Sequence, residues 1–372
     1  MNPQSKESSV DRDYVYIEDE EALNRFINEI EDSGYARCAI DTEADSLHCY
    51  EEKLCLIQFA AEDSLAVIDP LKVSDFSSLI DYLDTVNVWM HGADFDIRML
   101  SRSYGRAPKV VYDTQTASRL LGVRKFGLVN LVEDHFGVVL PKTSQKANWG
   151  KRPLSEKMLE YAVNDVRYLL EIAQKLTDDL NKLNRWDWFV ESCDHTKLIA
   201  SQIKEKDLDM IWRISGWGKL ENNGMAYLKA LWFWRDGEAS RRDKPTFKII
   251  GNNDLLRMAN ELQEGTSVKL PDRFPTSPVK RFETAIEEVS NMDPENFPKL
   301  EKRKRLKKNP KFDSRFNKLK SYRDKVSNEI GIDPTLIASR SNMEGIAHDP
   351  DNVQELLLNW QRELLVPALE KI

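Results

Sequence analysis

The chain has 372 residues, too many for a single hydrophobic core, and this length predicts two or three domains. Hydrophobic residues make up 41% of the chain and charged residues 31%. No apolar run approaches the roughly 20 residues that span a bilayer, and the polar N-terminus lacks the apolar core of a signal peptide. We therefore expect a cytoplasmic protein with no membrane association.

The expected elements of the first half follow from apolar periodicity. A helical pattern covers 18–31, and short β-like runs follow at 37–41, 53–60 and 64–68. Further along, strands are expected at 86–90 and 110–112, and helices at 76–83, 94–100, 114–121, 128–136 and 155 to about 183. Short connections between the first three strands predict an antiparallel meander, and the later alternation of strand and helix predicts a mixed five-stranded sheet covered by helices.

Strand signals largely vanish beyond about residue 205. A helical segment around Trp234-Arg235 leads to Lys244-Pro245, and a weaker echo around Tyr322-Arg323 leads to Ile332-Asp333-Pro334. The fold class is therefore α/β plus all-α. We predict a first domain over 1–206 with an ordered core at about 14–185, a helical domain over 207–293, a basic linker over 294–309, and a second helical domain over 310–372.

The net charge of −8 conceals a basic segment. Between Lys302 and Lys325, twelve Lys or Arg residues accompany two acids, a local balance of +10 that leaves −18 for the rest of the chain. Two interpretations remain open: a solvated helix face or linker, and a surface that binds nucleic-acid phosphates. The four cysteines have no Cys-x-x-Cys spacing, which argues against a zinc site.

Two carboxylates, Asp41 and Glu43, end the apolar run at 36–40. Side chains of a strand alternate between its faces, so these two acids point the same way and Thr42 points the other way. Like charges side by side are costly unless a cation lies between them, and a hard divalent cation is the usual solution.

Three more residues complete an acidic constellation. Asp96 follows the strand at 86–90 at a strand-to-helix junction, where side chains face the carboxyl edge of the sheet. Tyr161 and Asp165 are four residues apart and share one helix face. Each fragment is common by itself, but their order and spacing together predict a metal site, with Asp94 as a competing ligand to Asp96.

These fragments resemble the ribonuclease D family of DEDD-type 3′→5′ exonucleases with a tyrosine in the third motif. The segments that carry the resemblance are Ile40–Ser46 with Leu54–Gln58 for the first motif, His91–Asp96 for the second, Tyr161–Asp165 for the third, and Lys142, Gln145, Trp149 and Arg152–Leu154 for the preceding loop. Arg235–Ala239 with Asp243–Pro245 resembles an HRDC domain, and the last 70 residues match a second such module loosely.

The resemblance implies a ribonuclease H-like exonuclease domain that holds two divalent ions, Mg²⁺ or Mn²⁺. Asp41 would bridge both ions, Glu43 and Asp165 would complete the site of the ion that holds the attacking water, and Asp96 would serve the second ion. Tyr161 keeps its proton at neutral pH because a phenol has a pKa near 10, so we expect it to orient the water rather than act as a general base.

The candidate substrate contacts are Thr42, Lys142, Gln145, Trp149 and Arg152. Arg152 would bind phosphate and Trp149 would lie against a base or sugar. An equally open alternative is that Trp149 and Pro153-Leu154 anchor the loop against the long helix.

The resemblance implies an exoribonuclease that releases mononucleotides from the 3′ end of structured RNA such as tRNA precursors. A DNA 3′→5′ exonuclease of the same superfamily is the alternative, because sequence does not reveal contacts to the 2′-hydroxyl. A different class is an inactive nuclease retained as a nucleic-acid-binding module. RNA is the expected partner, DNA the alternative, and no obligate protein partner is expected.

Overall fold

The computed structural model describes residues 13–141, 143–203, 207–299 and 309–370. These residues form two compact units. Unit 1 lies within Met1–Ala44, Leu54–Ile203 and Leu306–Ile372, and unit 2 lies within Asp45–Lys53 and Lys204–Arg305. The domain boundaries expected at 206, 293 and 309 remain predictions.

Unit 1 is built on a mixed sheet with the strand order β1-β4-β3-β2-β5-β6. The strands are β1 Val15–Ile17, β2 Arg37–Ala44, β3 Leu54–Ala61, β4 Ser64–Ile68, β5 Asn87–Met90 and β6 Val110–Asp113. The expected meander is confirmed, because β2–β3 and β3–β4 are antiparallel, and β5 and β6 continue the sheet in parallel.

The expected count of five strands was wrong by one. The additional strand, β1, pairs in parallel with β4 at the edge of the sheet. It has three residues, too few for a period of two to stand out from the polar segment around it.

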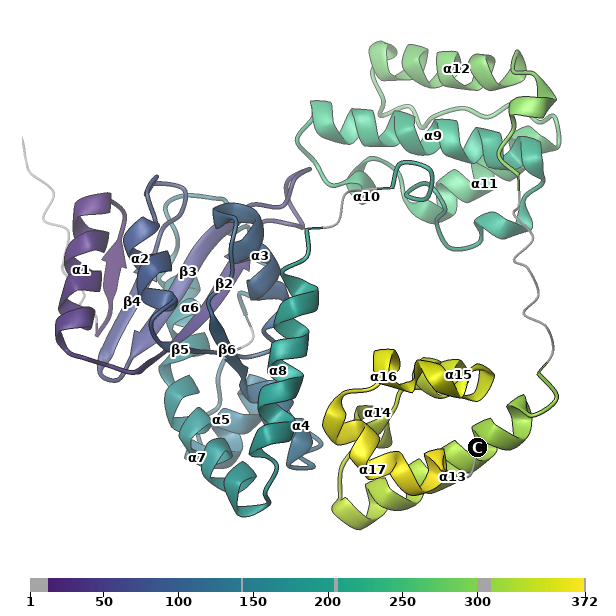
Figure 1. Cartoon of the computed structure of the whole chain (residues 1–372). Coiled ribbons are helices and arrows are strands. Elements are labelled where there is room, and N and C mark those ends of the chain that lie inside the picture. Colours follow the sequence, from purple (N-terminus) through teal and green to yellow (C-terminus); the bar gives the residue numbers. More distant parts are fainter. Residues whose placement is uncertain (1–12, 142, 204–206, 300–308, 371–372) are drawn as a thin grey trace, which may run out of the picture. The chain divides into compact units, whose positions relative to one another are not determined.

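Helices cover both faces of this sheet (Figure 1). They are α1 Glu20–Asp32, α2 Ser77–Leu83, α3 Asp94–Tyr104, α4 Thr114–Leu120, α5 Leu128–Phe136, α6 Glu156–Arg167, α7 Leu169–Lys182 and α8 Trp186–Ala200. Alternate residues of β2 enter different cores: Cys38 and Ile40 pack with α1 to α3, and Ala39 packs with α4, α5, α7 and α8. The single long helix expected from 155 to 183 is two helices, α6 and α7, which meet at Tyr168.

The last part of unit 1 is helical and packs into the same core as α7 and α8. Its helices are α13 Phe312–Ile330, α14 Pro334–Ile337, α15 Arg340–His348, α16 Val353–Leu356 and α17 Asn359–Leu369. Trp360 of α17 stacks on Trp188 of α8 with ring centroids 5.1 Å apart, and its indole donates to the Ser192 hydroxyl.

Unit 2 is all-helical, as expected for this stretch. Its helices are α9 Asn222–Arg241, α10 Thr246–Ile249, α11 Asn252–Gln263 and α12 Thr276–Ser290. Arg235 is buried in α9 and donates to the carbonyl of Ile250, fifteen residues on. Arg323 of α13 repeats this arrangement in unit 1 with the carbonyl of Ala338, also fifteen residues on, so the echo seen in sequence corresponds to a repeated structural interaction.

None of the described helices is both long and apolar enough to cross a membrane.

Candidate active site

Strand β2 carries Asp41 and Glu43 at the end where its pairing with β3 shifts register, between Glu43 and Ala44. Helix α6 brings Asp165 across from this strand end. Ligand atoms of Asp41, Glu43 and Asp165 all lie within 4.8 Å of one another. The strand alternation and the helix periodicity thus bring together three of the four predicted acids.

Asp96 is linked to this strand end through Thr42, which lines the same cavity as Asp41 and Glu43. Asp96 lies in the first turn of α3 and is 3% exposed, and the Thr42 hydroxyl donates to its carboxylate at 2.5 Å. Asp94, the competing ligand, is exposed instead and forms an ion pair with Arg98 at 2.9 Å. The junction therefore directs Asp96, not Asp94, toward Asp41.

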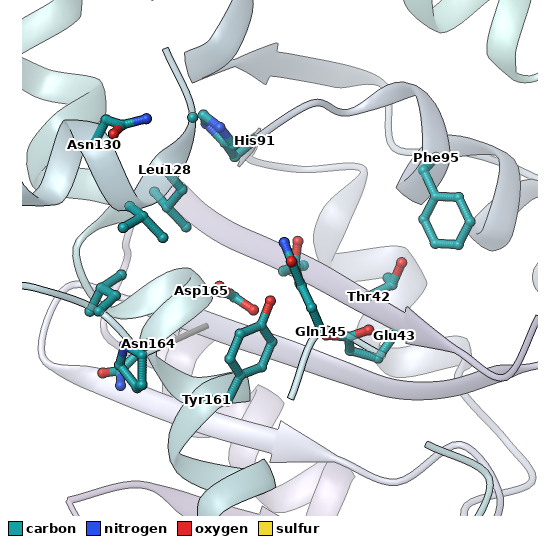
Figure 2. Close-up of a pocket in the computed structure, with 15 residues that line it drawn as sticks. Thr42, Glu43, His91, Phe95, Leu128, Asn130, Gln145, Tyr161, Asn164 and Asp165 are labelled. Carbon is teal, nitrogen blue, oxygen red and sulfur yellow. The ribbon is translucent and has the colours of Figure 1, made fainter. Parts of the chain in front are cut away.

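The three clustered acids line a cavity of about 470 Å³ together with Tyr161 and Gln145. Figure 2 shows the Tyr161 hydroxyl and the Asp165 carboxylate, both from α6, directed into the same space as Glu43 of β2. No lysine or arginine is among the described residues that line this cavity.

Burial and mutual repulsion raise the pKa of all four acids. Burial is the largest cause for each of them. For Asp41, burial and then the charge of Asp165 raise the pKa well above its usual value. The same causes raise the pKa of Glu43 to about 10, with Asp41 as the strongest charged neighbour, and burial raises the pKa of Asp165 to about 7 despite a hydrogen bond from Tyr161 that lowers it. For Asp96, burial and then the charge of Asp41 raise the pKa against the opposing hydrogen bond from Thr42.

This donor set fits hard divalent cations. Clustered oxygen ligands without a neighbouring cation hold protons until a positive ion replaces them, and Mg²⁺ and Mn²⁺ prefer oxygen ligands. Burial, with further effects of Asp165 and the β2 acids, also raises the pKa of Tyr161, so its hydroxyl keeps its proton and can donate a hydrogen bond.

The loop residues expected to contact substrate separate into two groups. Gln145 lines the cavity, whereas Lys142 lies outside the described residues. Trp149 is 1% exposed and packs behind Tyr161, with ring centroids 6.1 Å apart. The alternative interpretation of Trp149, as an anchor of the loop against α6, therefore has the structural support.

Arg152, expected to bind phosphate, is engaged with protein groups in this structure. Its guanidinium donates two hydrogen bonds of 2.6 Å to the Asp69 carboxylate. It also donates to the carbonyls of Trp149 and Cys55, at 2.6 and 2.8 Å. Asp69 is fully buried, so these contacts satisfy a charge inside the protein. The sequence could not show this, because Arg152 and Asp69 are 83 residues apart.

The cavity has further lining residues that were not among the predicted site residues. The cavity is also lined by His91, Phe95, Leu128, Asn130 and Asn164. Leu128 and Asn130 lie at the start of α5, whose sequence after Gly127 is that of an ordinary amphipathic helix, so nothing marked them as site residues. Asn164, in contrast, is the neighbour of Asp165 in the third motif segment. His91 lies 2.9 Å from the Thr114 hydroxyl, and burial lowers its pKa.

The comparisons with known proteins identify relatives of this chain. A family described as 3′-5′ exonuclease matches residues 14–181. The chain is 31% identical to a ribonuclease D of Xanthomonas oryzae over 90% of this chain and 93% of the relative, and 27% identical to a ribonuclease D of a Shewanella species over 100% and 97%. The crystal structure of Escherichia coli RNase D, an exoribonuclease involved in structured RNA processing, matches with a TM-score of 0.73 and 25% identity, over 96% of this chain and 98% of that one.

Proposed function

Because the chain belongs to the ribonuclease D family and is a 3′→5′ exoribonuclease, we propose that it removes mononucleotides from the 3′ ends of structured RNAs such as tRNA precursors, in the cytoplasm. The observation that carries this proposal is the cluster of Asp41, Glu43 and Asp165 within 4.8 Å, beside the protonated Tyr161.

We further propose that Asp41, Glu43, Asp96 and Asp165 hold two divalent cations, Mg²⁺ or Mn²⁺. Such ions supply a water of lowered pKa as nucleophile and stabilise the departing 3′-oxygen of the phosphodiester. The charge of Asp41 raises the pKa of Asp96, which links Asp96 to the other three acids, and the hydroxyl of Thr42 donates a hydrogen bond that orients the Asp96 carboxylate.

The remaining residues position the substrate. Tyr161 donates a hydrogen bond that orients the attacking water beside the scissile phosphate, because its raised pKa leaves it no role as a base at neutral pH. Gln145, from the loop opposite, offers an amide to the terminal sugar or phosphate in the same cavity. Trp149 acts on this site only indirectly, through its packing against Tyr161.

The test uses a 12-nucleotide RNA and the matched DNA, each labelled at the 5′ end, with Mg²⁺, Mn²⁺ or EDTA. We expect stepwise shortening of the RNA with either metal and none with EDTA. Asp41→Asn and Asp165→Asn should abolish shortening while the circular dichroism spectrum stays unchanged.

The other possible outcomes of this assay favour a different function. Faster shortening of the DNA would favour a DNA exonuclease. Binding of RNA without shortening under any metal condition would favour a nucleic-acid-binding module, and wild-type rates in either Asp variant would refute the assignment of the acids.

A further inference from the structure

Unit 1 contains a second cavity, of about 800 Å³, away from the four acids. Its walls are the loop that follows α4, at Gly122–Phe126, and the end of α13 with the turn that follows it, at Arg323–Pro334. Nothing in the proposed catalytic mechanism uses these residues.

The two walls are held firmly against each other. Buried Arg185 donates to the carbonyls of Leu120 and Ile330, both at 2.6 Å, and so joins the last residue of α4 to the last residue of α13. At Gly122 the backbone has a φ of +82°, and a Cβ there would overlap the carbonyl oxygen of Gly331. The cavity is therefore a built feature of the fold.

Its charge is suited to an anion. The acids that line the cavity are already engaged: Asp324 accepts two hydrogen bonds from Arg323, and Asp333 caps α14. In the described part of the chain, Arg119 and Arg124 also line the cavity but have no hydrogen bond or ion pair. The guanidinium of Arg119 lies 5.4 Å from the ring of Phe126, and its charge acts on Asp333 without a hydrogen bond to it among the described residues.

The loop that carries Arg124 also leads into the catalytic cavity. Gly127 to Asn130, its direct continuation, line the catalytic cavity that holds Asp41, Glu43 and Asp165. Leu128 lies four positions after Arg124, so their Cα atoms are at most about 14 Å apart. A strand stacked at about 3.4 Å per nucleotide covers that distance in at most about four nucleotides.

We propose that this second cavity is an RNA-backbone subsite, in which Arg119 and Arg124 bind phosphates a few nucleotides upstream of the 3′ end held in the catalytic cavity. The subsite rests on the proposed exoribonuclease function and extends it, because it gives the enzyme a preference for substrates with a longer 3′ tail. Guanidinium groups are well matched to phosphate, since they donate two parallel hydrogen bonds to its oxygens.

The first experiment compares full-length wild type with Arg124→Gln and with the double variant Arg119→Gln/Arg124→Gln, on a trinucleotide and on the 12-nucleotide RNA. We expect the ratio of kcat/KM for the 12-mer to kcat/KM for the trinucleotide to fall about tenfold in the double variant, because neither glutamine can make a charge-assisted hydrogen bond to phosphate. Arg25→Gln, an exposed change of the same charge on α1, is the matched control and should leave the ratio unchanged.

The second experiment measures binding of the 12-mer in EDTA by fluorescence anisotropy over a range of salt. The slope of log K against log salt should become shallower by about 0.7 for each phosphate that the variant no longer neutralises. Restoring the charge with Arg119→Lys/Arg124→Lys should recover most of the slope, whereas a defect of folding would not be repaired in this way.

An unchanged length ratio and salt slope in the double variant would overturn the subsite, even if the wild type shortens RNA normally. If the wild type shortens no RNA, the proposed function fails, and the salt slope in EDTA still decides whether the second cavity binds RNA. The exposed Arg124→Gln single variant decides the matter should the double variant fail to fold.

Discussion

Replacing Arg152 with methionine tests whether this arginine holds the fold together or contacts RNA. The change keeps most of the aliphatic volume but removes the partner of the fully buried Asp69. Breaking a buried ion pair from one side costs about 3–5 kcal/mol. The Tyr16 hydroxyl still donates to Asp69 at 2.7 Å, which favours the lower half of that range, so we expect a loss of about 4 kcal/mol or slightly less.

A loss of about 4 kcal/mol lowers Tm by roughly 8–16 °C in a unit of this size, at about 2–4 °C per kcal/mol. Differential scanning calorimetry of wild type, Arg152→Met, Asp69→Asn and the double variant would measure it. The double variant should be less damaged than the sum of the two single variants, because it leaves no unpaired charge.

The pH dependence sharpens this prediction. Burial raises the pKa of Asp69, but hydrogen bonds from Arg152 and Tyr16 outweigh it, so the pKa lies below its usual value. A carboxylate with a lowered pKa stabilises the fold above its unfolded pKa near 4, and this stability is lost as the pH falls through the folded pKa. Without Arg152, burial dominates and Asp69 is destabilising when ionised, so the Tm difference between wild type and Arg152→Met should be larger at pH 8 than at pH 4.

If Arg152→Met lowered Tm by less than 3 °C and weakened RNA binding in EDTA tenfold, this reasoning would be refuted. That pair of results would restore Arg152 as a phosphate contact. The reverse pair, a large Tm loss with little change in RNA affinity for the folded protein, is what the structure leads us to expect.

Three further predictions concern the catalytic cavity and the packing of unit 1. Tyr161→Phe should lower kcat about 100-fold, because it removes one positioned hydrogen-bond donor, and a kcat within threefold of wild type would contradict the role. The raised pKa values of the acids stabilise the metal-free fold at low pH, and this stability is lost as the pH rises toward about 7 for Asp165 and about 10 for Glu43. Mn²⁺ should therefore raise Tm more at pH 8 than at pH 6. An equal gain at both pH values would argue against metal binding at these acids. Gly122→Ala should cost about 2–5 kcal/mol, from a strained φ and a backbone overlap, whereas Gly105→Ala, with φ +77° but open space, should cost only about 1–2 kcal/mol, and equal losses in urea unfolding would refute the overlap.

The parts of the site that followed from sequence are those fixed by local geometry. Asp41 and Glu43 face one cavity because strand side chains alternate, and Tyr161 and Asp165 face it because four residues make about one helical turn. These relations hold wherever the elements form, so the sequence sufficed to group the residues. Their chemical roles stay predictions until the variants are measured.

The parts that sequence missed depend on distant partners. Arg152 was compatible with phosphate binding until the fold placed Asp69 beside it, and Trp149 was compatible with base stacking until the fold buried it. Likewise β1 is defined by its pairing with β4 rather than by its own three residues. Tertiary contacts decide such cases, and no local pattern encodes them.

The discontinuity of unit 1 bears on how the protein is made. The carbonyl of Ile330 that Arg185 requires and the indole that stacks on Trp188 belong to the last stretch of the chain, after all of unit 2 has been translated. During synthesis, α7 and α8 therefore emerge with an apolar surface whose covering helices do not yet exist. A nascent chain stopped after residue 305 exposes that surface, and we expect it to bind chaperones or aggregate rather than to persist as a smaller working enzyme.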